Sequence, residues 1–187
     1  MRRFLQRLLR RLLRAVEPPL AGPHDTFATI ATLRARGVTI GENCAIYTDF
    51  FSTEPYLVTI GEHVGISGGV KFMTHDGAAW LMRGDHPKRQ ALGTITIGDN
   101  CFIGENSLIL CGTRIGSDCL IGTGAVVRGT IPDNSLVIGN PGQVVGRASL
   151  FIEMLRQGKD SLDTLGMNEA ARRDMLLRHF GLAGERS

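Results

Sequence analysis

A six-residue repeat of large apolar side chains constrains the fold of this chain more than any other feature of its sequence. The repeat runs without interruption from 97 to 127, and it runs from 40 to 72 with a single two-residue slip. This period matches neither an amphipathic helix nor a simple hairpin, and it predicts a parallel β-helix with three hexads in each coil. The repeat positions are Ile40, Ile46, Ile60, Ile66, Phe72, Ile97, Ile103, Ile109, Ile115, Ile121 and Val127.

A second series of residues lies two positions before the first. Side chains two apart on a strand point to the same face, so we expect both series to point inward. Three of the four cysteines belong to this second series and are predicted to be buried, whereas Cys111 lies outside it. The members of the second series are Val38, Cys44, Val58, Val64, Val70, Ile95, Cys101, Ser107, Thr113, Cys119, Ala125 and Ile131.

Glycine often follows the large apolar residue, as at Gly98 and Gly116. Because glycine adopts a left-handed backbone conformation without steric cost, we expect these glycines to supply that conformation at the corners of the coil.

Two interruptions break the repeat. The two-residue slip falls at 54–57, and a longer gap separates Val58 from Ile95, which are 37 residues apart where three hexads take 18. The 19 extra residues must leave the coil as a loop, which we place roughly at 76–93. Loops of this length in compact domains are usually functional or disordered.

The two ends of the chain differ from the repeat. Residues 1–17 combine six arginines with leucines at three- and four-residue spacing, which predicts a basic amphipathic helix ended by Pro18 and Pro19. This helix would pack on the body or on a partner subunit, lie on an anionic membrane surface, or act as a transit presequence. Residues 18–37 are expected to connect it to the β-helix at 38–148. Residues 149–187 are predicted to be a helical extension whose second helix begins at Asn168 and ends at Gly181.

Composition excludes several classes of protein. With 43% hydrophobic and 21% charged residues, the chain is not a disordered one. Because the arginines gather in 1–17, the rest of the chain is slightly acidic, which argues against a general nucleic-acid-binding surface. No apolar run is long enough to span a bilayer, and no secretory signal or zinc-binding cysteine spacing occurs. We expect a cytoplasmic protein, with membrane association at the inner surface only through 1–17.

The hexads, together with NPGQVVGR at 140–147 and the segments FFSTEPYLVTIG and VKFMTHDG, resemble the hexapeptide-repeat acyltransferases. The resemblance covers about 38–148, and it is strongest to the O-acetyltransferases of sugars and polysaccharides. It implies a left-handed β-helix, a homotrimer, and acetyl-CoA bound between neighbouring subunits as co-substrate, with no metal required. The implied reaction moves an acetyl group from acetyl-CoA to a hydroxyl of a sugar or saccharide.

Catalytic residues of that family carry over at the root of the long loop. His75 matches the position of the catalytic histidine, and imidazole can take a proton from a hydroxyl near neutral pH. His75 is therefore the candidate general base. Asp76 either holds the imidazole in the correct tautomer or forms a turn.

Binding residues carry over with the same resemblance. Glu54 has two readings, an acceptor contact or turn chemistry before Pro55. Phe102 stands where related enzymes carry a tryptophan in the acetyl channel. The residues implied for the acceptor are Tyr47, Asp49, Glu54, Trp80, Arg83 and Phe102. Those implied for coenzyme A are Gly104, Gly122, Thr123, Arg128, Pro141 and Arg147.

Two other functions stay open on the same scaffold. One is N-acetylation of an amino-sugar nucleotide, although the extra nucleotide-binding domain of many such enzymes is not in this sequence. The other is a non-catalytic or γ-carbonic-anhydrase-like β-helix. The latter needs three zinc-binding histidines, and the spacing of His63, His75 and His86 is not typical of a zinc site.

Overall fold

The structure is a computed structural model that describes residues 26–182 of the 187-residue chain. The amphipathic helix predicted for 1–17 lies outside the described residues and stays a prediction. The chain divides into two compact units, one ending at Ile152 and the other beginning at Glu153. The first unit contains the six-residue repeat, and the second contains a short helical segment.

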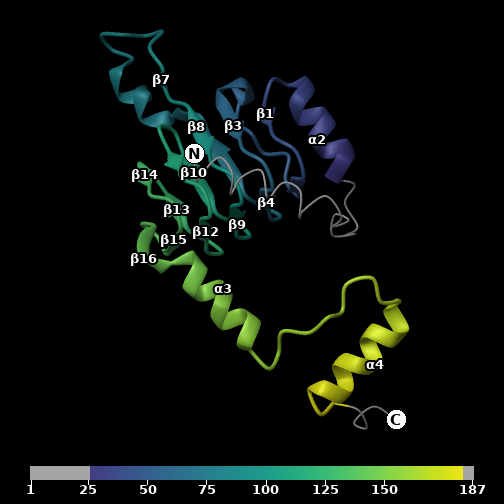
Figure 1. The fold of residues 1–187 in the computed structure, drawn as a ribbon. Helices are drawn as coiled ribbons and strands as arrows, with labels where there is room; N and C mark the ends of the chain where they lie inside the picture. Colours follow the sequence, from purple (N-terminus) through teal and green to yellow (C-terminus); the bar gives the residue numbers. More distant parts are fainter. Residues whose placement is uncertain (1–25, 183–187) are drawn as a thin grey trace, which may run out of the picture. The chain divides into compact units, whose positions relative to one another are not determined.

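Three sheets of short strands, which we call sheets A, B and C, form the first unit (Figure 1). Sheet A contains β1 (Thr39–Ile40), β3 (Val58–Ile60), β8 (Ile95–Ile97), β11 (Arg114–Ile115) and β14 (Thr130–Ile131). Sheet B contains β2 (Ala45–Ile46), β4 (Gly65–Ile66), β9 (Phe102–Ile103), β12 (Leu120–Ile121), β15 (Ser135–Ile138) and β16 (Gln143–Arg147). Sheet C contains β5 (Lys71–Met73), β10 (Leu108–Leu110) and β13 (Val126–Val127). Within the repeat, consecutive strands fall in different sheets and pair in parallel with strands of the next coil, so this unit is the predicted parallel β-helix.

The core of the β-helix consists of the two predicted series. Every large apolar residue of the first series is buried, and so is every residue of the second series except Cys44. Cys101 and Cys119 are buried as predicted, whereas Cys44 and Cys111 are only partly buried. The inward direction of both series is therefore confirmed, with the exception at Cys44 in the first coil, where the stack has a neighbour on one side only.

The last coil departs from the predicted register. The six-residue spacing after Ala125 predicts Ile131 in the second series, but Ile131 pairs with Ile115 and so occupies a position of the first series. The corner that contains Gly129, which has a φ of 82°, is two residues shorter than the others. Val137 therefore takes the next large position, opposite Ile121.

The expected role of the repeat glycines is wrong. The left-handed conformation falls three residues after the large apolar residue, at positions such as Asn43, Asn100 and Asp118, whose φ values are 57°, 57° and 61°. Gly98 instead lies against the next coil, where a Cβ atom would stand 2.7 Å from the backbone of Gly116 and Ser117. Close approach of neighbouring coils, and not the backbone angle, explains the glycine.

Replacing Gly98 with alanine should therefore destabilise the fold. The added Cβ atom meets backbone that cannot rotate away, so we expect the free energy of unfolding to fall by about 1–3 kcal/mol. Gly84→Ala is the matched control, since a Cβ atom there meets no atom within 4 Å. Denaturant unfolding at a fixed protomer concentration measures both variants, and equal midpoints for the two would refute the close-contact explanation.

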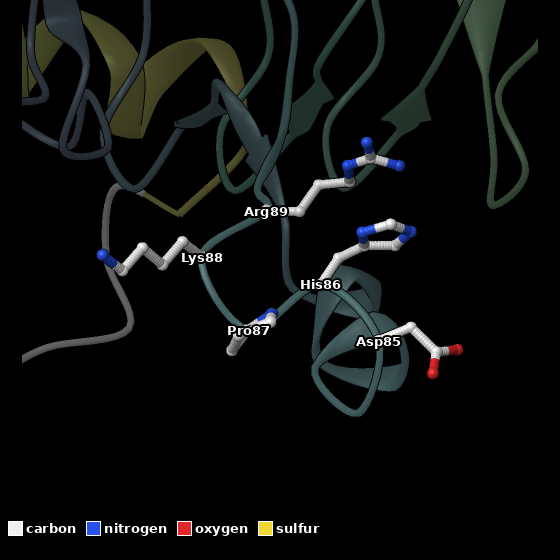
Figure 2. Close-up of a pocket in the computed structure, with 5 residues that line it drawn as sticks. All are labelled: Asp85, His86, Pro87, Lys88 and Arg89. Carbon is white, nitrogen blue, oxygen red and sulfur yellow. The ribbon is translucent and has the colours of Figure 1, made fainter.

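The long loop predicted at 76–93 is an ordered hairpin. Its two ends form β6 (His75–Asp76) and β7 (Ala91–Leu92), which pair antiparallel, and a 3₁₀ helix, η2 (Gly77–Met82), follows β6. We call residues 77–90 the arm; Figure 1 shows it beside β7 at the edge of the stack. Beyond η2, residues 85–89 line an open hollow in which the side chains of His86 and Arg89 point to one side and Lys88 to the other (Figure 2).

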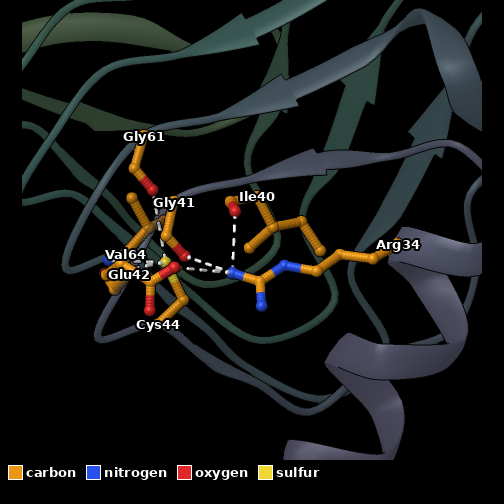
Figure 3. A network of polar contacts seen from close by, with 7 residues as sticks. All are labelled: Arg34, Ile40, Gly41, Glu42, Cys44, Gly61 and Val64. Atoms are coloured by element: carbon orange, nitrogen blue, oxygen red, sulfur yellow. Dashed lines mark hydrogen bonds and ion pairs between the residues drawn. The ribbon is translucent and has the colours of Figure 1, made fainter.

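A helix covers the first coil, in a segment expected only as a connection. Helix α2 (Thr26–Ala35) buries Leu33 in the core. The guanidinium of Arg34 donates to the carbonyl oxygens of Ile40 at 2.8 Å and Gly41 at 3.0 Å (Figure 3). These carbonyls have no preceding coil to pair with, so the arginine satisfies them. In the same network the Cys44 thiol lies 3.2 Å from the carbonyl oxygen of Gly61, and burial raises its pKa.

The other end of the repeat closes with a hairpin and a helix. Strand β16 runs antiparallel to β15, and helix α3 (Ala148–Gln157) follows it. In the second unit, helix α4 (Glu169–His179) begins as predicted, because the Asn168 side chain accepts a hydrogen bond from the Ala171 N–H at 2.8 Å. Gly181, with a φ of 70°, follows its end. No helix among the described residues has the length and apolar character needed to cross a membrane.

Candidate active site

The two-residue slip of the repeat forms a turn beside sheet C. Phe51 forms a parallel bridge with Phe72, and the two rings stack with centroids 4.4 Å apart. After it the chain turns at Ser52, whose φ is 30°, and enters a short 3₁₀ helix, η1 (Pro55–Leu57). This turn brings residues 52–54 next to the residues that follow β5 on the neighbouring coil.

The turn surrounds one nitrogen of His75 with oxygen atoms. Nδ1 of His75 lies 3.0 Å from Oγ of Ser52, 3.2 Å from Oε2 of Glu54 and 3.4 Å from Oγ1 of Thr53. The His75 side chain is 36% exposed and that of Glu54 is 14% exposed. Within the described residues Nε2 of His75 has no hydrogen-bond partner. The imidazole is thus held by one nitrogen and presents the other to solvent.

Glu54 is held by hydroxyl groups on both of its oxygens. Oγ1 of Thr53 donates to Oε1 at 2.6 Å, and Oγ1 of Thr74 donates to Oε2 at 2.8 Å. These two bonds, followed by the contact with His75, hold the pKa of Glu54 below its ordinary value. Glu54 is therefore a carboxylate at neutral pH. A carboxylate beside Nδ1 favours the tautomer with its proton on Nδ1, which leaves a lone pair on Nε2.

Asp76 makes different contacts. Its carboxylate accepts a hydrogen bond from the Ala78 N–H at 3.0 Å, which caps η2, and another from Arg128 at 3.0 Å. The Ala78 N–H and then Arg128 lower the pKa of Asp76. No hydrogen bond joins Asp76 to His75 among the described residues. Asp76 was predicted either to form a turn or to orient the imidazole, and its contacts are those of a turn-forming residue. Glu54, and not Asp76, lies beside the imidazole of His75.

The predicted acceptor residues lie on three separate parts of the first unit. Tyr47 and Asp49 precede the turn at 52–54, and the Asp49 carbonyl accepts a hydrogen bond from Arg36 at 3.1 Å. Trp80 lies on the arm, 65% exposed, with the guanidinium of Arg83 4.1 Å from its ring centroid. Phe102 points outward from sheet B, whereas His75 follows a strand of sheet C. Of these residues, Glu54 lies beside His75, with its Oε2 3.2 Å from Nδ1.

The predicted coenzyme residues are spread over the later coils. The N–H groups of Gly104 and Gly122 donate to the carbonyl oxygens of Ile121 and Val137 on the next coil. Arg128 is paired with Asp76. The remaining three, Thr123, Pro141 and Arg147, lie on or next to the strands of sheet B. The coenzyme roles of all six residues stay predictions.

Sequence reasoning missed three of the contact residues, Ser52, Thr53 and Thr74. The signal in the sequence was the two-residue slip, because extra residues in the coil next to His75 must form a turn close to that histidine.

His63 pairs with Asn100 through Nδ1 at 3.0 Å, in a ladder of polar side chains at one corner of the coil. Over the described part of the chain, no group of three side chains is arranged to bind a metal ion.

Known proteins resemble this chain in sequence and in fold. Residues 94–129 match the family model described as bacterial transferase hexapeptide (six repeats). Protein CapG of Staphylococcus aureus is 39% identical over 140 residues, which are 73% of this chain and 81% of that protein. The putative lipopolysaccharide biosynthesis O-acetyl transferase WbbJ of Escherichia coli K12 is 39% identical over 51 residues, 27% of this chain and 26% of that protein.

Among solved structures, the hexapeptide-repeat containing acetyltransferase VCA0836 from Vibrio cholerae superposes with a TM-score of 0.55 and 21% identity. The superposition covers 66% of this chain and 81% of that one. At this level of identity the superposition shows a shared fold.

Proposed function

This chain belongs to the bacterial transferase hexapeptide family and is an acyltransferase, and we propose that it transfers the acetyl group of acetyl-CoA to a hydroxyl of a sugar or saccharide. We also infer that its β-helix is left-handed, as the resemblance to this family implies. In this proposal His75 is the general base and Glu54 orients it.

One observation carries the proposal: the carboxylate of Glu54 lies 3.2 Å from Nδ1 of His75, and Nε2 faces solvent without a partner among the described residues. A sugar hydroxyl is a weak nucleophile, so it needs a base at the moment of attack. Nε2 takes the hydroxyl proton while the oxygen attacks the thioester carbonyl. The C–S bond then breaks, the ester is formed, and the proton passes from Nε2 to the sulfur of coenzyme A.

The arm supports a saccharide acceptor. Trp80 is 65% exposed and carries Arg83 over its ring, an arrangement that offers a flat apolar surface beside hydrogen-bond donors. Sugar rings have apolar faces and hydroxyl edges, so they match both features. The pairing of His75 with Leu92 ties the root of the arm to the candidate base.

An acceptor screen tests the proposed reaction. Purified protein with acetyl-CoA is given monosaccharides, oligosaccharides, sugar nucleotides, amino sugars and free serine, and release of the coenzyme A thiol is followed. The proposal expects turnover with a sugar that has no free amine, and a product that hydroxylamine cleaves as an ester. Turnover only with free serine or amines, or a product that resists hydroxylamine, would reject it.

The outer faces of the sheets support a homotrimer. Sheet A presents a polar row to solvent, whereas the outward residues of sheets B and C are mostly apolar. The row on sheet A is Thr39, Thr59, Thr96, Arg114 and Thr130. The outward residues of sheets B and C include Ala45, Phe102, Leu120, Leu136, Leu108, Leu110 and Val126. Two apolar faces on each thin prism suit a closed assembly in which neighbours cover both, and we propose that acetyl-CoA binds between them.

Sedimentation should find a particle of three 20.3 kDa chains at micromolar concentration. Leu120→Glu places a charge on the outer face of sheet B, where burial at an interface would leave it unpaired, so we expect the trimer to dissociate. Thr59→Glu makes the same addition on sheet A and should leave the trimer intact. A monomeric wild-type protein, or dissociation by Thr59→Glu alone, would contradict the proposed assembly.

A further inference from the structure

Thr74 stands at the point where the coil, the arm and the candidate base meet. Its side chain is fully buried, and its hydroxyl donates to Oε2 of Glu54 at 2.8 Å. Its backbone carbonyl accepts a hydrogen bond from the Gly93 N–H at 2.9 Å, at the far root of the arm. Oε2 of Glu54 is the same oxygen that lies 3.2 Å from Nδ1 of His75.

The hydroxyl of Thr74 serves no partner other than this carboxylate among the described residues. A buried hydroxyl is costly without a hydrogen bond, and valine has nearly the same shape without that cost. A threonine at position 74 in place of valine is therefore explained by the need for a hydrogen-bond donor to Oε2 of Glu54. With Thr53 on Oε1, the two hydroxyls prevent the carboxylate from rotating away from the imidazole.

Neither hydroxyl near Nδ1 chooses a tautomer by itself. That of Thr53, 3.4 Å away, donates its proton to Glu54. Oγ of Ser52, 3.0 Å away, can accept a hydrogen bond from a protonated Nδ1 or donate one to an unprotonated Nδ1. A carboxylate can only accept. The position of Glu54 therefore decides which nitrogen carries the proton, and Ser52 can hydrogen-bond to either tautomer when Glu54 moves away.

We propose that Thr74 is a positioning residue that holds Glu54 against His75 and thereby keeps the imidazole proton on Nδ1. The inference rests on the proposed function, in which Nε2 must be free to accept the proton of the acceptor hydroxyl. Loss of the Thr74 hydroxyl leaves every group that would touch a substrate in place, and it increases the fraction of imidazole with its proton on Nε2.

Thr74→Val tests the inference through two readouts. We expect kcat to fall about tenfold, the scale of one lost hydrogen bond to a charged group, with KM for acetyl-CoA unchanged. In protein labelled with ¹⁵N-histidine, the His75 signals should change from the tautomer with the proton on Nδ1 to a mixture. Thr74→Ser keeps the hydroxyl and should restore both readouts.

Thr113→Val is the matched control. Thr113 is also fully buried, and its hydroxyl donates to the carbonyl oxygens of Leu110 at 2.6 Å and Val127 at 3.2 Å, away from Glu54. Its loss should lower stability and leave the His75 tautomer unchanged. Thr74→Ala is a second variant without the hydroxyl, for use if valine prevents folding.

The outcomes separate this inference from the function on which it rests. Wild-type kcat and an unchanged His75 tautomer in Thr74→Val or Thr74→Ala would overturn the positioning role, whatever His75 does. If His75→Ala keeps full activity, the general-base proposal fails, and the tautomer measurement still decides whether Thr74 positions Glu54. A tautomer change in Thr113→Val as large as that in Thr74→Val would also overturn the inference.

Discussion

Replacing His75 with alanine should lower kcat for acetyl transfer by at least about 100-fold, the contribution expected of a general base. Without the imidazole, the acceptor hydroxyl has no group to take its proton during attack on the thioester. KM for acetyl-CoA should stay within about twofold, because the imidazole acts on the acceptor. Initial rates of thiol release with the acceptor found in the screen measure both parameters.

Two further variants define what the imidazole supplies. His75→Asn keeps a hydrogen-bond donor but no base, and it should be as slow as His75→Ala. His86→Ala removes an exposed imidazole from the arm, and it should retain most of the activity. Turnover by His75→Ala at nearly the wild-type rate would reject His75 as the base and direct attention to His86.

Replacing Glu54 with glutamine should lower kcat on the order of 100-fold. The glutamine amide is almost the same size, but its NH₂ group can donate to Nδ1, which favours the tautomer with the proton on Nε2. That tautomer cannot accept the hydroxyl proton. Glu105→Gln makes the same substitution at an exposed glutamate and should leave the rate unchanged. If Glu54→Gln affects only KM for the acceptor, Glu54 contacts the sugar, as the first reading of the sequence held.

The same substitution should change how stability depends on pH. The hydroxyls of Thr53 and Thr74 hold the pKa of Glu54 below its ordinary value of 4.5. Such a group stabilises the fold fully above its unfolded pKa, and this stabilisation is lost as the pH falls through the folded pKa. The stability difference between wild type and Glu54→Gln should be constant above about pH 5.5 and shrink at lower pH. Denaturant unfolding across this range measures it, and a difference that grows on acidification would contradict the assignment.

The tertiary structure brought together groups that no local pattern connects. Glu54 and His75 are 21 residues apart, and they meet because the slip turns beside the next coil. Asp76 and Arg128 are 52 residues apart, and their ion pair links the root of the arm to a corner of a later coil. In both pairs the two side chains are far apart in sequence, and they come into contact because their coils stack on one another.

The sequence by itself determined the parallel β-helix, the two inward series and the position of His75 at the root of a long insertion. These follow from spacing alone, because each inward residue repeats along a regular coil and its burial depends only on its place in the hexad. Only the tertiary structure decided the shortened corner before Ile131, the close contact at Gly98 and the contact of Glu54 with His75. These three features depend on how neighbouring coils are placed against each other, and the spacing of residues along the sequence does not specify that placement.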